Sequence, residues 1–137
     1  MKTKAIVILA IICIISFLTT SCVRSQDVVI LDEEGKSYFS DFSIDENKVH
    51  VFCRITLKNN SAETVDVKLN AFMPKDVENG LLLQPVLQGI NLEDDTPVFR
   101  VPAESEKSFY VDFIGEHGNN DIKQDRLLPE IRIALLD

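Results

Sequence analysis

The side chains that could bind a transition metal are few and far apart in this sequence. It has two histidines, His50 and His117, and three cysteines, no two of which are in a Cys-x-x-Cys spacing. Zinc and copper sites are usually built from three or four imidazole or thiolate ligands, so we expect no bound metal. The nucleophile elbow of hydrolases and the glycine-rich phosphate loop are also missing from the sequence. We therefore predict no cofactor, no catalytic residues and a solvated His50.

The carboxylates allow two further chemistries, calcium binding and general acid–base catalysis. Glu93, Asp94 and Asp95 follow Asn91 closely and offer several oxygen ligands, but they lack the Asp-x-Asp-x-Asp-Gly spacing that wraps one calcium ion. A solvated acidic loop is therefore the favoured interpretation. Two carboxylates for glycoside hydrolysis could be chosen from almost any pair of loops, so an unplaced pair is no evidence. An enzyme that uses acidic loop residues remains an alternative without a named site.

The remaining reactive group is the thiol of Cys22, which ends an N-terminal segment with the composition of a secretory signal. Lys2 and Lys4 precede fourteen uncharged, mostly aliphatic residues at positions 5–18, and a small polar run follows. The stretch Leu18-Thr19-Thr20-Ser21-Cys22 resembles the bacterial lipobox, in which the cysteine is acylated before the signal is cut. The resemblance implies that residues 1–21 are removed and that Cys22 carries the lipid, with palmitate among its acyl chains.

Two alternatives for the N-terminus stay open. The uncharged run over residues 5–23 is nineteen residues long, and about 17–25 residues suffice to span a bilayer as an uncleaved signal anchor. A cleaved but unlipidated signal would give a secreted protein. In all three cases Lys2 and Lys4 hold the start of the chain in the cytoplasm. We therefore expect residues from 23 onward outside the cytoplasm, with the membrane as a partner through the lipid anchor.

The charge balance limits the partners of the mature protein. The chain has 14 lysines and arginines against 22 aspartates and glutamates, and loss of Lys2 and Lys4 leaves 12 against 22, a net charge of −10. An acidic protein of this kind is repelled by phosphate backbones and anionic lipid, so we predict no nucleic-acid partner. An envelope protein is the expected partner.

The chain after the signal has the period of β-strands. Alternation is clearest over residues 49–57, where five apolar side chains share one face. Residues 65–71 and 109–113 alternate in the same way, and shorter strands are expected at 28–31, 37–44, 98–101 and 131–136. The turn residues Asn59-Asn60-Ser61 predict a hairpin between strands 49–57 and 65–71. Cys53 shares the apolar face of its strand, so we expect a reduced thiol in the core and no disulfide with Cys22.

The segments between these strands carry turn and loop signals. Residues 45–48 predict a hairpin turn, and residues 74–80 predict one helical turn. Pro85 lacks a backbone donor, which indicates an edge strand or a bend. Residues 88–96 are expected to form an acidic loop.

About seven short strands without an amphipathic helix favour an all-β fold, specifically an immunoglobulin-like antiparallel β-sandwich. We assign residues 22–36 to the lipidated cysteine and spacer, and residues 37–137 to the sandwich domain. The strand-and-turn order from residue 49 to 113, which includes Lys58-Asn59-Asn60-Ser61 and Phe109-Tyr110-Val111-Asp112-Phe113, resembles the small immunoglobulin-like domains of bacterial surface lipoproteins, the telokin-like kind among them. The resemblance implies an accessory or binding role at the cell surface and assigns no functional residue.

Two aromatic side chains are expected on the outside of this domain. Phe52 and Tyr110 lie on the outward sides of their strands, beside Arg54 and Asp112. Exposed aromatic clusters often mark contacts with other molecules, so the pair is a candidate binding patch. The alternative is that each is partly covered by a loop or by strand 37–44. The sequence thus favours a surface-tethered binding or accessory module, with an enzyme or a structural envelope lipoprotein as the alternatives.

Overall fold

The computed structural model describes residues 28–32, 35–122 and 126–136, which form an all-β fold with one short helix. Its elements are β1 (Val29–Leu31), β2 (Tyr38–Asp45), β3 (Lys48–Asn59), β4 (Val65–Phe72), α2 (Pro74–Glu78), β5 (Val86–Asn91), β6 (Phe99–Val101), β7 (Glu106–Glu116) and β8 (Glu130–Leu135). The predicted signal over residues 1–21, the lipidation of Cys22 and most of the spacer lie outside the described residues. Within the described residues, no helix has the length and apolar character to cross a membrane.

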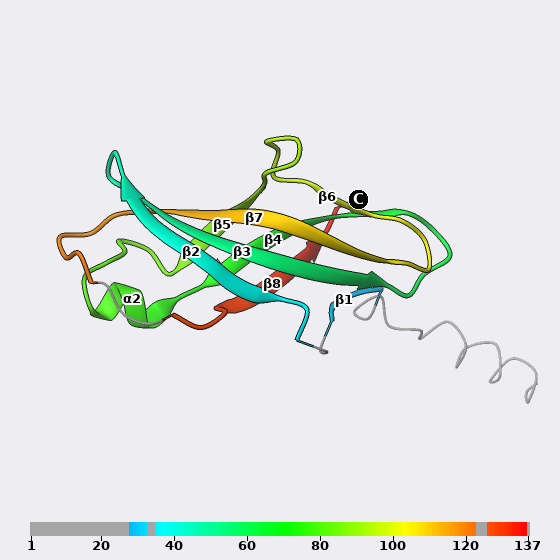
Figure 1. Cartoon of the computed structure of the whole chain (residues 1–137), viewed down its shortest axis with the longest axis horizontal. Helices are drawn as coiled ribbons and strands as arrows, with labels where there is room; N and C mark the ends of the chain where they lie inside the picture. The colour runs from blue at the N-terminus through cyan, green and yellow to red at the C-terminus, as the bar shows by residue number, and fades with distance from the viewer. Residues whose placement is uncertain (1–27, 33–34, 123–125, 137) are drawn as a thin grey trace, which may run out of the picture.

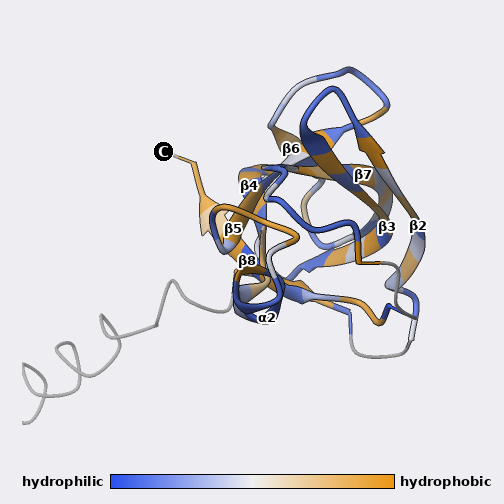
Figure 2. Cartoon of the chain, turned by 90° about the vertical axis from the view of Figure 1, so that its left-hand side faces the viewer, coloured by the Kyte–Doolittle hydropathy of each residue, from blue (hydrophilic) through white to orange (hydrophobic). Residues whose placement is uncertain are grey.

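The eight strands form one antiparallel sheet that curls nearly into a barrel (Figures 1 and 2). β3 pairs with β7 over eleven residue pairs on one edge, and its other edge is shared by β1 and β2. β4 pairs with β8 on one edge and with β5 and β6 on the other. The pairing of β5 with β7 joins these two halves. The strand count is one more than the seven or so that the sequence predicts.

The core lies inside this curled sheet because each long strand alternates between an inward and an outward side. Five side chains of β3 face inward and are at most 1% exposed. They pack against inward side chains of the other strands, among them Val67, Leu69, Leu87, Phe99, Val111 and Phe113. Each fully buried side chain of this size stabilises the fold by about 1.5–3 kcal/mol. The strands expected from apolar alternation are confirmed, as is the burial of Cys53.

The two local turn predictions are also confirmed. Glu46 and Asn47 both have positive φ, 46° and 64°, and join β2 to β3 as the tight turn of a two-residue hairpin. Residues Pro74–Glu78 form the helical turn α2.

The hairpin predicted between residues 49–57 and 65–71 is wrong, because β3 and β4 belong to different halves of the sheet. The reason lies at Asn59, whose side chain is buried. Its Nδ2 donates to the carbonyl oxygens of Val101 (3.0 Å) and Pro102 (3.1 Å), and its Oδ1 accepts from the N–H of Ser61 (2.9 Å). Asn59 therefore ties the end of β3 to the β6–β7 connection, and the chain crosses to the other half of the sheet.

Two predictions around Pro85 need correction. β5 begins directly after Pro85 and extends to Asn91, so the acidic loop expected over residues 88–96 starts four residues too early. Gln88 pairs with Asn70 of β4 and with Ile114 of β7, which makes β5 an interior strand. Pro85 therefore marks a bend, as one of the two predictions had it, and the edge-strand alternative is wrong.

Candidate functional site

The outer face of β2, β3 and β7 brings the predicted patch residues together. Residues directly opposite one another in paired strands project on the same side of a sheet. The register places Arg54 between Tyr38 of β2 and Tyr110 of β7, so these three side chains form one row across three strands. The guanidinium carbon of Arg54 lies 6.0 Å from the centre of the Tyr110 ring, within the range of a cation–π interaction.

A second row lies beside the first and contains the other predicted aromatic. Phe52 is opposite Asp112 of β7, and its ring is stacked on that of His50, with ring centres 6.0 Å apart and planes inclined by 10°. His50 Nδ1 lies 2.7 Å from Asp112 Oδ2. The prediction of a solvated His50 is therefore wrong, because the imidazole is half-buried against a carboxylate. We call this surface the aromatic face and define it by Tyr38, His50, Phe52, Arg54, Tyr110 and Asp112.

The aromatic face is partly open to solvent. Tyr110 is 61% exposed and Tyr38 is 46% exposed. Phe52 is half-buried by its neighbours on the same face. β2 pairs with the edge of β3, so it lies beside Phe52 and does not cover it. Tyr110 is thus open to solvent, whereas Phe52 is partly covered by side chains of its own face and not by β2.

Asp112 is unusual for an outward-facing residue of a sheet. Its side chain is only 9% exposed. Oδ1 is buried and accepts no hydrogen bond from the described residues. Burial raises the pKa of the Asp112 carboxyl above its ordinary value, and the hydrogen bond from His50 offsets this only in part. The aromatic face therefore contains a desolvated carboxyl group with one oxygen that has no hydrogen-bond partner among the described residues.

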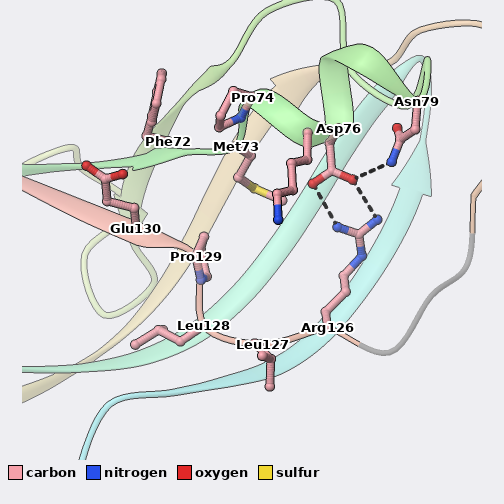
Figure 3. Close-up of a pocket in the computed structure, with 11 residues that line it drawn as sticks. Phe72, Met73, Pro74, Asp76, Asn79, Arg126, Leu127, Leu128, Pro129 and Glu130 are labelled. Carbon is pink, nitrogen blue, oxygen red and sulfur yellow. Dashed lines mark hydrogen bonds and ion pairs between the residues drawn. The ribbon is translucent and has the colours of Figure 1, made fainter.

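A pocket that the sequence did not predict lies beside α2 (Figure 3). It has a volume of about 410 Å³ and is lined by two segments far apart in the chain, residues 72–79 and 126–130. Its walls are mainly apolar and are formed by Phe72, Met73, Pro74, Leu127, Leu128 and Pro129. The sequence signal was weak, because each segment contains only a short apolar run next to a proline.

The most buried polar groups of this pocket are paired with each other. Arg126, whose side chain is 9% exposed, binds both oxygens of Asp76, with Nη1 to Oδ2 at 3.2 Å and Nη2 to Oδ1 at 3.5 Å. Asn79 Nδ2 donates to Asp76 Oδ1 at 3.1 Å, as the dashed lines in Figure 3 show. The Arg126 guanidinium also stacks on Phe42 of β2 at 4.3 Å. Asp76 is therefore held as the acceptor of an ion pair, which is a structural arrangement and not that of a general acid.

The acidic loop and His117 form contacts of their own. Asp94 Oδ1 accepts from Thr96 through the backbone N–H (3.2 Å) and the hydroxyl (2.8 Å), so it closes the loop on itself. His117 Nε2 lies 2.9 Å from Asp121 Oδ1, far in the chain from the His50 pair. In the described part of the chain, no three His, Cys, Asp or Glu side chains gather as a metal site would require.

Comparison with known proteins found no match for this chain. No family model matches the sequence, and no similar chain is found among the curated proteins or the solved structures. The resemblance to lipoprotein domains therefore stays a prediction from the order of strands and turns.

Proposed function

We propose that this protein is a membrane-anchored extracytoplasmic lipoprotein that binds another envelope protein through its aromatic face. The observation that carries the proposal is the open row of Tyr38, Arg54 and Tyr110 across three strands. Tyrosine and arginine are enriched among the residues that contribute most of the binding energy at the centres of protein interfaces. We include in this proposal that the curled sheet is layered like an immunoglobulin-like sandwich.

The position of β1, the first described strand, supports an approach of the partner to the aromatic face from the side. β1 and α2 lie in opposite halves of the molecule along its long axis (Figure 1). A lipid on Cys22 would tether the domain through six residues that precede Val28, a reach of at most about 20 Å. The strands that carry the aromatic face, β2, β3 and β7, run along the long axis (Figure 1), and a neighbouring protein in the same membrane could reach them from the side.

We propose binding and not catalysis, for a reason that lies in the pocket beside α2. A general acid or base needs a carboxyl that can exchange a proton with a ligand. Asp76 instead accepts hydrogen bonds from Arg126 and Asn79 within the protein. The more buried of the two carboxylates that line this pocket is thus engaged within the protein, which favours binding over catalysis.

Site-specific photocross-linking in the host tests the binding proposal. A benzophenone amino acid replaces Tyr110 in the full chain, and the matched control carries it at Lys68, an exposed outward residue of β4. We expect a discrete cross-linked protein from position 110 and none from position 68. Equal yields of the same products from both positions would refute recognition through the aromatic face. A purely structural lipoprotein would instead cross-link to its own copies or to the cell wall.

The anchor is tested separately. Cys22→Ala should release the protein from membranes or block its processing, and Cys53→Ala should leave anchoring unchanged. Intact mass spectrometry of the wild-type protein should find an acylated N-terminus at Cys22. A disulfide between Cys22 and Cys53 would contradict the lipoprotein proposal.

A further inference from the structure

Arg54 differs from the other arginines of the described chain in lacking an acidic partner. Arg100 binds Asp66, Arg126 binds Asp76 and Arg132 binds Glu130, with closest distances of 2.9, 3.2 and 3.2 Å. Arg54 forms no ion pair with a described carboxylate, although the chain has 22 acidic residues. Its Nε is buried and donates no hydrogen bond to any atom of the described chain.

An unpaired, half-buried guanidinium has lost hydration without gaining a counter-charge. Such a group is costly unless something compensates it. The nearest candidate on the same face, Asp112, is diagonal to Arg54 in the register and turns the other way, with Oδ2 on His50 at 2.7 Å. The Tyr110 ring at 6.0 Å compensates Arg54 only weakly. The Arg54 guanidinium is therefore held in place and partly dehydrated before a partner binds.

We infer that the protein bound at the aromatic face places an Asp or Glu carboxylate on Arg54, surrounded by apolar side chains that contact Tyr38 and Tyr110. This inference rests on the proposed function and adds the chemistry of the partner. A carboxylate matches the planar fork of arginine and forms two charge-assisted hydrogen bonds with it. The flanking tyrosines exclude water from that pair, which strengthens it.

A protein carboxylate is favoured over two other anionic ligands. Lipid headgroups and acidic polysaccharides carry many charges, and a mature chain of net charge −10 repels them at long range. A single carboxylate within an apolar protein surface acts at short range and meets little of that repulsion. The open rings of Tyr38 and Tyr110 also require apolar partner groups, which a protein surface supplies.

The test converts the expected ion pair into a covalent bond in the full-length protein. Arg54→Lys places an amine at the same position, and a zero-length carbodiimide joins that amine to an adjacent carboxylate as an amide, with loss of water to the reagent. Arg54→Gln is the matched variant without an amine. Arg100→Lys is the positive control, because Asp66 should be linked to position 100 within the chain. Peptide mass spectrometry identifies each linked residue.

We expect position 54 to be linked to an Asp or Glu of the protein that position 110 cross-links. Arg54→Gln should also lower the yield of the position-110 cross-link by at least about tenfold, whereas Arg54→Lys should retain most of it. The inference fails, with the proposed function intact, if position 110 captures a protein but position 54 gives no amide while the Arg100→Lys control does. An amide to Asp112 or to a sugar acid also refutes it. If position 110 captures nothing, the proposed function fails as well.

Discussion

The inner and outer faces of β3 show how differently one strand can use its two sides. Val49, Val51, Cys53, Ile55 and Leu57 face inward, carry no charge and are at most 1% exposed. His50, Phe52 and Arg54 face outward and are half-buried, with a carboxylate and a tyrosine as their neighbours on β7. The inner side chains need no partner from outside the chain, because they contact other core residues. On the outer side, buried polar atoms of Arg54 and Asp112 have no partner among the residues that the structure describes.

This difference indicates that the two faces serve separate tasks. Close packing without polar atoms stabilises the fold, whereas desolvated polar groups cost stability and are retained where a partner can satisfy them. Changes on the inner face should therefore alter stability, and changes on the outer face should alter binding with little loss of stability. Four predictions test that division, in order of decreasing effect.

The largest effect is expected from truncating an inner aromatic of β7. Phe113→Ala should lower the free energy of unfolding by about 3–5 kcal/mol, because it removes a fully buried ring and leaves a cavity. Tyr110→Ala, three residues away on the outer face, should change it by less than about 1 kcal/mol. Urea unfolding of both variants measures the contrast. Similar losses for the two would mean that the outer face is part of the core.

A smaller loss is expected when bulk is added on the inner side. A Cβ on Gly89 would lie 2.8 Å from the backbone oxygen of Leu69 and 2.9 Å from Cε1 of Phe113, both too close for a methyl group. Gly89→Ala should therefore destabilise the protein by about 1–3 kcal/mol through overpacking. Thermal melts compare it with Gly35→Ala, whose Cβ has open space but whose φ of 71° strains the backbone. An unchanged melting temperature in Gly89→Ala would show that β4 and β7 can move apart.

Cys53 tests whether the inner face excludes water. Burial raises the pKa of its thiol to about 12, so almost no thiolate is present near pH 8. Alkylation of Cys53 in the native protein should be at least about a hundredfold slower than in urea-unfolded protein, as followed by peptide mass spectrometry. Cys53→Ala should cost about 1 kcal/mol from lost packing. Rapid native labelling would place the thiol at the surface or reveal frequent opening of the sheet.

The smallest effect concerns Asp112 and depends on pH. Its pKa is raised in the folded state, so the native protein holds this proton more tightly than the unfolded chain does. The stability that it contributes is complete below the ordinary Asp pKa of about 3.9 and is lost as the pH rises through the raised value. Asp112→Asn should therefore gain stability over the wild type as the pH rises from about 4 to 7. Urea midpoints at both pH values check the sign, and a gain that shrinks with pH would contradict it.

The strands of this fold could be predicted from the sequence, but their partners could not. Alternation reports which side chains share a face, because one face is buried, and it carries no information on which strand lies alongside. Asn59-Asn60-Ser61 has the composition of a hairpin turn, yet the buried Asn59 amide bonds to carbonyls of a connection more than forty residues away. Only the folded chain reveals that contact.

The candidate site shows the same limit. The outward positions of Phe52 and Tyr110 follow from the period of their strands. The pairing of His50 with Asp112 does not, because it requires the register between β3 and β7. The pocket beside α2 also escapes sequence reasoning, since Asp76 and Arg126 meet across fifty residues and no motif links them.

The pairing of β3 with β7 also sets the order in which the chain can fold. The paired residues, from Lys58 with Glu106 to Lys48 with Glu116, are 48 to 68 residues apart in the chain. Contacts of such long range slow folding, because the intervening chain must be ordered before they form. If the chain emerges N-terminus first, β2 and β3 can form their hairpin early. The apolar side of β3 then stays exposed until β7 is synthesised, and such exposed apolar surface makes a nascent protein prone to aggregation.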